Sequence, residues 1–194
     1  MPRTEKQFQS IREKTKARIL STALELFAHK GFKGTTISDI AKAAGISKGL
    51  AYNYFSSKQD LMKSVLNLLV VEIEQLFGAT QNISDPYEKL KVIIESTFDS
   101  LEKDETFWRL YVSFILQPEV KEEADLITSS LLDDGFNLFE KIFKEIGVKK
   151  PKKEAKLLGA IVDGISFHYI FNKDSYPLKQ MKKFILSKYS KENF

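Results

Sequence analysis

Residues 47 to 54 form a basic, aromatic and hydrogen-bonding stretch rather than an ordinary charged one. Ser47 is suited to cap a helix, which places Lys48 in the first turn and Tyr52 close behind it. A lysine there can donate to guanine O6 or N7 or to a phosphate, and a tyrosine hydroxyl can donate to phosphate oxygens. Asn53 can bond a phosphate or an adenine edge. These groups indicate a surface that contacts DNA.

Two short helices joined by a glycine turn are expected to position these groups. Thr36 and Asp39 form a capping-box pattern, and apolar residues then recur at helical spacing up to Ala44. Gly45 follows where a chain leaving a helix favours a residue without a Cβ atom, and Ser47 supplies a second N-cap. This order predicts a helix-turn-helix, whose second helix can enter a major groove.

Amphipathic helices are predicted on both sides of this motif. One occupies residues 17–31 with Gly31 as its C-cap, and the next opens at the capping-box pair Ser57 and Asp60. Over residues 12–72 this succession resembles the TetR family of one-component transcriptional regulators. The matching stretches are Ile19–Phe27, Gly31–Ile37, Asp39–Ala41, Ala44–Gly49 and Tyr52–Phe55, followed by Lys58.

The resemblance implies a DNA-binding domain at residues 12–72 and a helical ligand-binding and dimerisation domain at residues 73–194. It implies a sequence-specific, ligand-responsive repressor that binds a palindromic operator as a homodimer. The expected partners are double-stranded DNA, an unidentified small-molecule effector and a second copy of the chain, and activation in place of repression stays open. The residues expected to contact DNA are Thr36, Ser47, Lys48, Gly49, Leu50, Tyr52, Asn53, Tyr54 and Lys58.

Thr36 and Lys58 are included because each lies at the positive end of a helix dipole, which suits phosphate. Leu50 could touch a thymine methyl group or pack into the core of the head. The family often has a small polar residue at position 50 and a larger aliphatic one at 51, so Leu50 and Ala51 depart from its pattern.

Three further assignments in the head also have alternatives. Tyr52 and Tyr54 could be core residues instead of phosphate contacts, whereas Phe55 is expected in the core. The alternative for Lys48 is a solvated lysine at a helix start. The basic arm before residue 19, with Arg12, Lys14, Lys16 and Arg18, either contacts the DNA backbone or minor groove or is frayed and solvated.

Charge is distributed unevenly along the 194 residues, whose net charge is +4. Residues 1–65 hold 12 Lys or Arg against 5 Asp or Glu, residues 66–148 hold 7 against 17, and residues 149–194 hold 11 against 4. A basic head suits phosphate binding, and an acidic middle is expected to point away from DNA. The basic C-terminal region is interpreted as a solvated surface, with a second nucleic-acid contact as the alternative.

The remainder of the chain shows no strand-like alternation, and turn signals divide the whole into about nine helices, so an all-α fold is expected. Large rings are frequent between Phe98 and Phe143. They are either ordinary core residues or the lining of an effector cavity. Asp163, on an apolar helix, could bind a cationic group of the effector or pair across a dimer contact. The candidate pocket residues are Phe98, Trp108, Tyr111, Phe114 and Asp163.

Two C-terminal helices carry the pattern expected of a dimer interface. Small residues within 154–171 would let two helices approach closely, and apolar residues of the last helix recur at helical spacing. A stripe alone is also typical of an ordinary core, but the resemblance implies a four-helix bundle between two copies. The residues are Gly159, Ala160, Gly164 and Ser166, then Leu178, Met181, Phe184, Ile185 and Tyr189.

An enzyme is the rival class, and the motifs do not favour it. His29 and His168 are isolated, and no HExxH, Walker A or dinucleotide fingerprint is present. Cysteine is absent, and neither a metal site nor a cofactor is expected. A helical module that binds protein instead of DNA is a third class. No apolar run long enough for a membrane span and no secretory signal is seen, so a cytoplasmic location is expected.

Overall fold

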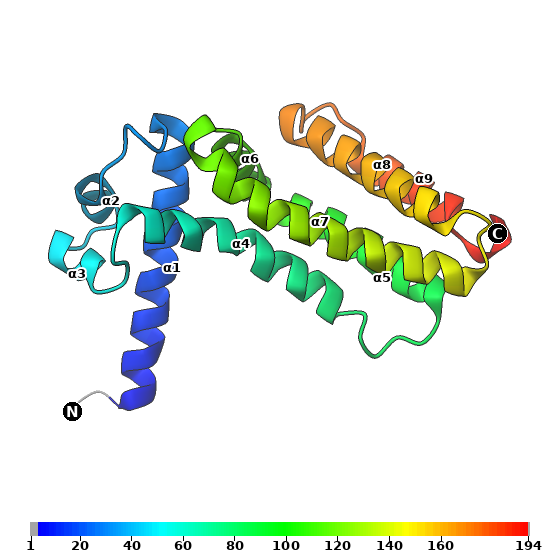
Figure 1. Ribbon diagram of the computed structural model, residues 1–194, viewed down its shortest axis with the longest axis horizontal. Helices are drawn as coiled ribbons and strands as arrows, with labels where there is room; N and C mark the ends of the chain where they lie inside the picture. Colours follow the sequence, from blue (N-terminus) through cyan, green and yellow to red (C-terminus); the bar gives the residue numbers. More distant parts are fainter. Residues whose placement is uncertain (1–3, 194) are drawn as a thin grey trace. The chain divides into compact units, whose positions relative to one another are not determined.

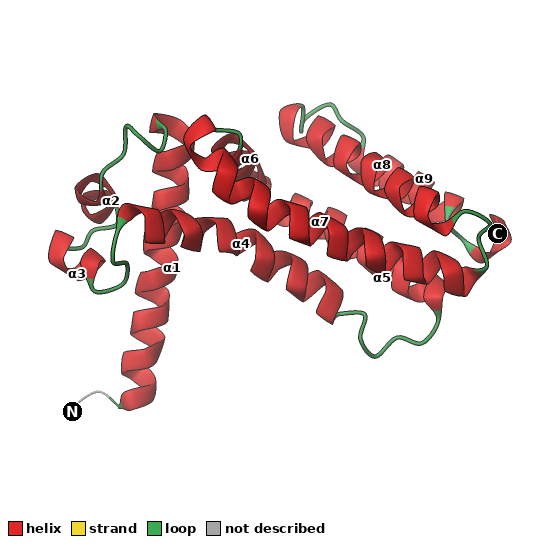
Figure 2. Cartoon of the chain, in the orientation of Figure 1, coloured by secondary structure: helices red, strands yellow, loops and turns green. Residues whose placement is uncertain are grey.

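The computed structural model describes residues 4–193. Within them every regular element is helical (Figures 1 and 2), which confirms the expected all-α fold. No helix in this range has the length and apolar character needed to cross a bilayer. The helices are α1 (Glu5–Lys30), α2 (Ile37–Ala43), α3 (Lys48–Tyr52), α4 (Lys58–Gly78), α5 (Pro86–Lys103), α6 (Glu105–Ile115), α7 (Pro118–Ile146), α8 (Pro151–Phe171) and α9 (Leu178–Lys188), with a 3-10 turn at Lys191–Asn193.

Helix α1 begins well before its apolar stripe. Thr4 and Gln7 form a capping box, in which each side chain bonds the backbone N–H of the other residue. The helix stays largely exposed until Ile19, the first fully buried side chain. The basic arm is therefore solvated but helical. It is not frayed as the alternative predicted, because the capping box at Thr4 stabilises the first turn of the helix.

The chain divides into two compact units. The first contains the residues up to Leu68 together with Leu110–Leu126. Its core is made where α1, α2 and α4 meet the end of α6. The fully buried residues there include Phe27, Ile40, Leu61, Leu66 and Phe114.

The predicted domain bounds, 12–72 and 73–194, follow sequence motifs, whereas the compact units follow packing. Packing adds Leu110–Leu126 to the head because these residues contribute Phe114 and Val120 to its buried core. The assignment of functions to the two domains stays a prediction.

The second unit contains Leu69–Arg109 and the chain from Ile127 onward. Within it α5 packs against α8 and α9, which also contact each other. A Cβ atom on Gly159 would lie 2.6 Å from a ring carbon of Phe136, so Gly159 lets α8 approach α7 of the same chain. Gly159 thus has a role inside one subunit, although the sequence assigned it to the contact between two.

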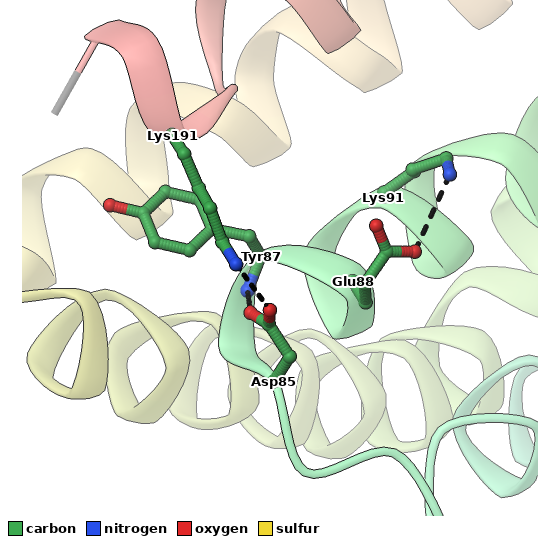
Figure 3. Close-up of polar contacts among 5 residues, drawn as sticks. All are labelled: Asp85, Tyr87, Glu88, Lys91 and Lys191. Atoms are coloured by element: carbon green, nitrogen blue, oxygen red, sulfur yellow. Dashed lines mark hydrogen bonds and ion pairs between the residues drawn. The ribbon is translucent and has the colours of Figure 1, made fainter.

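The C-terminal turn is fastened to the start of α5, as Figure 3 shows. The Asp85 carboxylate accepts a hydrogen bond from the Tyr87 backbone N–H at 2.9 Å and forms an ion pair with Lys191 at 2.5 Å. The Lys191 hydrogen bond, followed by the Tyr87 backbone bond, holds the pKa of Asp85 below its usual value of 3.8. Lys191 also lies 5.5 Å from the centroid of the Tyr87 ring. The turn and α5 are therefore joined by charge and ring contacts.

Candidate nucleic-acid interface

The predicted helix-turn-helix is present as α2 and α3, with the expected caps. The Thr36 hydroxyl oxygen accepts from the Asp39 backbone N–H at 3.1 Å, and the Asp39 carboxylate accepts from the Thr36 backbone N–H at 2.9 Å. Gly45 adopts φ = 68°, a left-handed conformation that glycine reaches at no steric cost. The Ile46 N–H then donates to the Ala41 carbonyl at 3.0 Å, which closes the turn.

The second helix presents its polar residues to solvent. The Ser47 hydroxyl accepts from the Leu50 backbone N–H at 3.1 Å and so caps α3. Ala51 is the buried residue of α3, whereas Lys48 and Tyr52 are exposed. Asn53, which follows the helix, is exposed as well. The groups predicted to contact DNA at Ser47, Lys48, Tyr52 and Asn53 are thus gathered on one accessible end of the motif.

Leu50 and Gly49 complete this surface. Leu50 is 38% exposed, so it does not belong to the core of the head. No atom lies within 4 Å of the position a Cβ atom would take on Gly49. Internal packing therefore does not require glycine at position 49, and the absent side chain leaves the backbone open to close approach from outside. Phe55, by contrast, is 2% exposed and is a core residue as expected.

Tyr54 connects α3 to the first half of α1. Its ring is half-buried and lies 6.4 Å, between centroids, from the ring of Phe55. The Arg12 guanidinium carbon lies 5.5 Å from the centroid of the Tyr54 ring. Arg12 belongs to the basic arm, and its contact with Tyr54 brings a fixed positive charge beside α3.

Thr36 and Lys58 have partners inside the head. The Thr36 hydroxyl donates to the Asp39 carboxylate at 2.6 Å. This bond is the main reason why the pKa of Asp39 is below its usual value. The Lys58 ammonium donates to the carbonyls of Phe32 at 3.0 Å and Thr35 at 3.1 Å. The single hydroxyl donor of Thr36 is already bonded to Asp39, so contact with a phosphate would have to use the third ammonium proton of Lys58 or the helix-terminal N–H groups.

The cap of α4 differs slightly from its prediction. Ser57 accepts from the Asp60 backbone N–H at 3.0 Å, as a capping box requires. The Asp60 carboxylate, however, reaches back to the backbone N–H of Ser56 at 2.8 Å instead of that of Ser57. The hydrogen bonds at the start of α4 therefore include Ser56 as well as the predicted pair Ser57 and Asp60.

Residues 19–65, which include α2 and α3, match the model of the bacterial regulatory proteins of the tetR family. These residues form a tetR-type DNA-binding region. It is 27% identical to the HTH-type transcriptional activator FasR of Mycolicibacterium smegmatis over 167 residues, which cover 84% of this chain and 75% of FasR. It is 36% identical to the repressor KstR2 of the same organism over 112 residues, 56% of this chain and 51% of KstR2.

The fold of the whole chain is also that of TetR-family proteins. The structure of NalD, described as the secondary repressor of the MexAB-OprM multidrug efflux pump in Pseudomonas aeruginosa, superimposes with a TM-score of 0.72. NalD is 26% identical, and the match covers 92% of this chain and 94% of that one. These relatives are transcriptional regulators rather than enzymes, and this chain is a DNA-binding transcriptional regulator.

The five predicted pocket residues are distributed over both units. Tyr111 and Phe114 belong to the first unit, where Phe114 stacks on Phe27 at 5.3 Å and the Tyr111 hydroxyl donates to the Leu66 carbonyl at 3.0 Å. Phe98 and Trp108 belong to the second unit. Phe98 is fully buried, and Trp108 packs edge-on against Phe107. Their role as pocket residues stays a prediction.

Asp163 lies at the edge of an exposed apolar face of α8. Its carboxylate is solvent-exposed in the single chain, yet desolvation by the surrounding protein raises its pKa above the usual value. Asp163 is therefore available to a group outside this chain.

The exposed face of α8 was only partly predicted. Its small residues Ala160 and Gly164 were recognised, but the large apolar residues beside them were not. Leu157 is 48% exposed, Phe167 51% and Phe171 66%, and Phe184 of α9 is 64% exposed. The spacing of residues 157, 160, 164, 167 and 171 by three and four was the signal in the sequence that could have identified this face. In α9, Leu178, Ile185 and Tyr189 are instead buried within the chain.

Proposed function

We propose that this chain is a ligand-responsive transcriptional repressor that binds a near-palindromic operator as a homodimer. The observation that carries the proposal is the exposed end of the helix-turn-helix, where Lys48, Leu50 and Tyr52 face solvent around a helix capped by Ser47. Lys48 and Leu50 would read base edges, and the tyrosine hydroxyls would bond phosphates. Such a protein would act in the cytoplasm, beside the chromosome.

The face of α8 and α9 that carries Leu157, Phe167, Phe171 and Phe184 is the proposed dimer contact. Four large apolar side chains, each about half exposed or more, favour contact with another surface. The small residues Ala160 and Gly164 between them would let the partner helix approach closely. A two-fold dimer would place two α3 helices about 34–36 Å apart, one turn of DNA, which is why a palindromic operator is proposed.

The effector is proposed to be a small molecule bound in the second unit. The rings of Phe98 and Trp108 suit an apolar ligand, with Asp163 assigned to the dimer contact rather than to the effector because it lies beside the exposed apolar face. An effector that binds one arrangement of the two heads more tightly than another would change operator affinity. A coupling of about 1–3 kcal/mol is typical of such regulation.

Operator selection from random DNA tests the proposal with the purified full-length protein. We expect an enriched sequence with two inverted half-sites about one helical turn apart, bound at least about tenfold more tightly than random DNA at moderate salt. A reporter gene under that sequence distinguishes repression from activation. Enrichment of no sequence, or of a single half-site bound by one subunit, would refute the proposed operator recognition.

A further inference from the structure

The side chain of Gln117 joins the turn between α6 and α7 to the end of α1. Its carbonyl oxygen accepts from the Phe32 backbone N–H at 2.7 Å, and its amide nitrogen donates to the Phe27 carbonyl at 2.7 Å. The same nitrogen lies 3.4 Å from the Ser113 carbonyl, a weaker contact. One carboxamide thus bonds a backbone acceptor and a backbone donor that lie on either side of Gly31, where the chain leaves α1 with φ = 79°.

Phe32 continues this connection toward the DNA-binding motif. Its carbonyl accepts from the Lys58 ammonium at 3.0 Å, and the ammonium lies 4.3 Å from the centroid of the Phe32 ring. Lys58 is the first residue of α4 and follows α3 after a short turn. A continuous path of contacts therefore runs from Gln117 through Phe32 to Lys58, and ends at the start of α4, the helix that follows the predicted reading helix.

Two ion pairs also hold the segment that follows Gln117 against the rest of the first compact unit. Glu119 pairs with Lys33 at 2.8 Å, and Glu123 pairs with Lys63 of α4 at 3.0 Å. The lysines of both pairs are more than half exposed, so solvent and salt weaken these bridges. The Gln117 bonds are short, directional and partly buried, and they are better suited to fix geometry.

We propose that Gln117 is a positioning residue for the DNA-binding motif: its carboxamide sets the backbone around Phe32 and, through Lys58, the start of α4. The effect of this positioning on DNA reading rests on the function proposed above. Glutamine fits because a single planar group supplies both a donor and an acceptor, which neither leucine nor ionised glutamate can do.

Hydrogen–deuterium exchange of the full-length protein tests the positioning role without DNA. In Gln117→Leu we expect the Phe32 amide to exchange about five- to tenfold faster than in the natural protein, because it loses its hydrogen-bond acceptor. Amides at the start of α4 should also exchange faster, whereas those of α8 should not change. Gln81→Leu, at an exposed loop residue, is the matched control. Unchanged exchange at Phe32 and α4, or equal acceleration in every helix, would overturn the proposal.

Gln117→Glu adds a readout that a purely structural role would not give. The ionised carboxylate still accepts from Phe32 but repels the Phe27 carbonyl, whereas the protonated form can donate to it. We expect exchange at Phe32, relative to the natural protein at the same pH, to return toward normal as the pH is lowered from about 7 to about 4, through the ordinary pKa of a glutamate. A ratio independent of pH would contradict the bidentate role of the side chain.

Operator affinity of the same variants separates this inference from the proposed function. If the natural protein selects an operator, Gln117→Leu should weaken operator binding by at least about tenfold while circular dichroism shows an intact fold. Normal operator affinity in a variant with faster exchange at Phe32 would overturn the link between Gln117 and DNA reading. Failure of the natural protein to select DNA would refute the proposed function, whereas the exchange data would still decide the positioning role.

Discussion

The guanidinium carbon of Arg12 lies 5.5 Å from the centroid of the Tyr54 ring. Arg12 comes from the exposed first half of α1, and Tyr54 follows α3, so the contact joins the basic arm to the proposed DNA-binding surface. An arginine held over an aromatic ring keeps its charge and most of its donors available to a phosphate. The arm is therefore positioned by the fold and is a candidate part of the interface.

Replacing Arg12 with glutamine is expected to weaken binding to the operator and to random DNA by the same factor. A phosphate contact carries no sequence information, and its loss should reduce the magnitude of the salt slope by about one. Fluorescence anisotropy titrations at several salt concentrations measure both quantities. Lys183→Gln, at an exposed lysine of α9, is the control and should change neither. A salt slope that does not change in Arg12→Gln would exclude Arg12 from the interface.

Substitutions of Lys48 and Tyr54 are expected to change DNA binding in different ways. Lys48→Ala should reduce the preference for the operator over single-base variants by about 1–3 kcal/mol at the base pair it contacts. Tyr54→Phe, which removes one hydroxyl, should weaken all sequences alike. Competition binding against a panel of operator variants distinguishes the two patterns. If Lys48→Ala lowers every affinity equally, Lys48 contacts a phosphate and the base-reading assignment is wrong.

Much of the head could be predicted from the sequence because its signals are local. The capping pair Thr36 and Asp39, the turn at Gly45 and the cap at Ser47 each depend on residues only a few positions apart, and the structure contains all three. The same locality explains the all-α prediction and the order of the helices.

Contacts between distant residues could not be read in the same way. Gln117 bonds Phe32 across 85 sequence positions, and no pattern of residue types marks such a pair. Lys58 was assigned to phosphate because it begins a helix, but its ammonium is turned toward the carbonyls of Phe32 and Thr35. Local rules identify a helix start and a charge, whereas the direction of a long side chain depends on the tertiary partners that it finds.

Tyr111 is expected to stabilise the first unit through its hydroxyl. The residue is 2% exposed and donates to the Leu66 carbonyl at 3.0 Å, so Tyr111→Phe should lower the free energy of unfolding by about 1 kcal/mol. Urea titration followed by circular dichroism measures the change. Tyr52→Phe is the matched control, because Tyr52 is 47% exposed and its loss of a hydroxyl should leave stability unaltered. Equal stabilities of all three proteins would show that the buried hydroxyl contributes nothing.

Asp85 is expected to make the folding stability of the chain depend on pH in acidic solution. Its pKa is lower in the folded chain than its usual value of 3.8, chiefly through the Lys191 hydrogen bond, so the ionised form stabilises the fold. This contribution is present at neutral pH and is lost as the pH falls through the lowered pKa. Asp85→Asn keeps a residue that can cap α5 but removes the charge.

Thermal unfolding at a series of pH values measures the effect of Asp85. The melting temperature of Asp85→Asn should be below that of the natural protein near neutral pH, and the two should converge in acid, below the lowered pKa. Because both partners are at the surface, high salt should also reduce the difference. Asp174→Asn, at an exposed aspartate, should follow the natural protein throughout. A difference that persists in acid would mean that the substitution acts through packing or capping instead of charge.

Phe171 and Leu126 offer a matched test of the proposed dimer contact, because they are 66% and 67% exposed in the single chain. Phe171→Glu should dissociate the dimer, since it places a charge within the apolar face of α8, where a partner helix would bury it without a counter-charge. Leu126→Glu, on α7 outside this face, should leave the oligomer intact. Sedimentation velocity over a range of concentrations gives the dissociation constant of each protein. Dissociation by both variants, or by Leu126→Glu alone, would contradict the proposal that the dimer contact lies on α8.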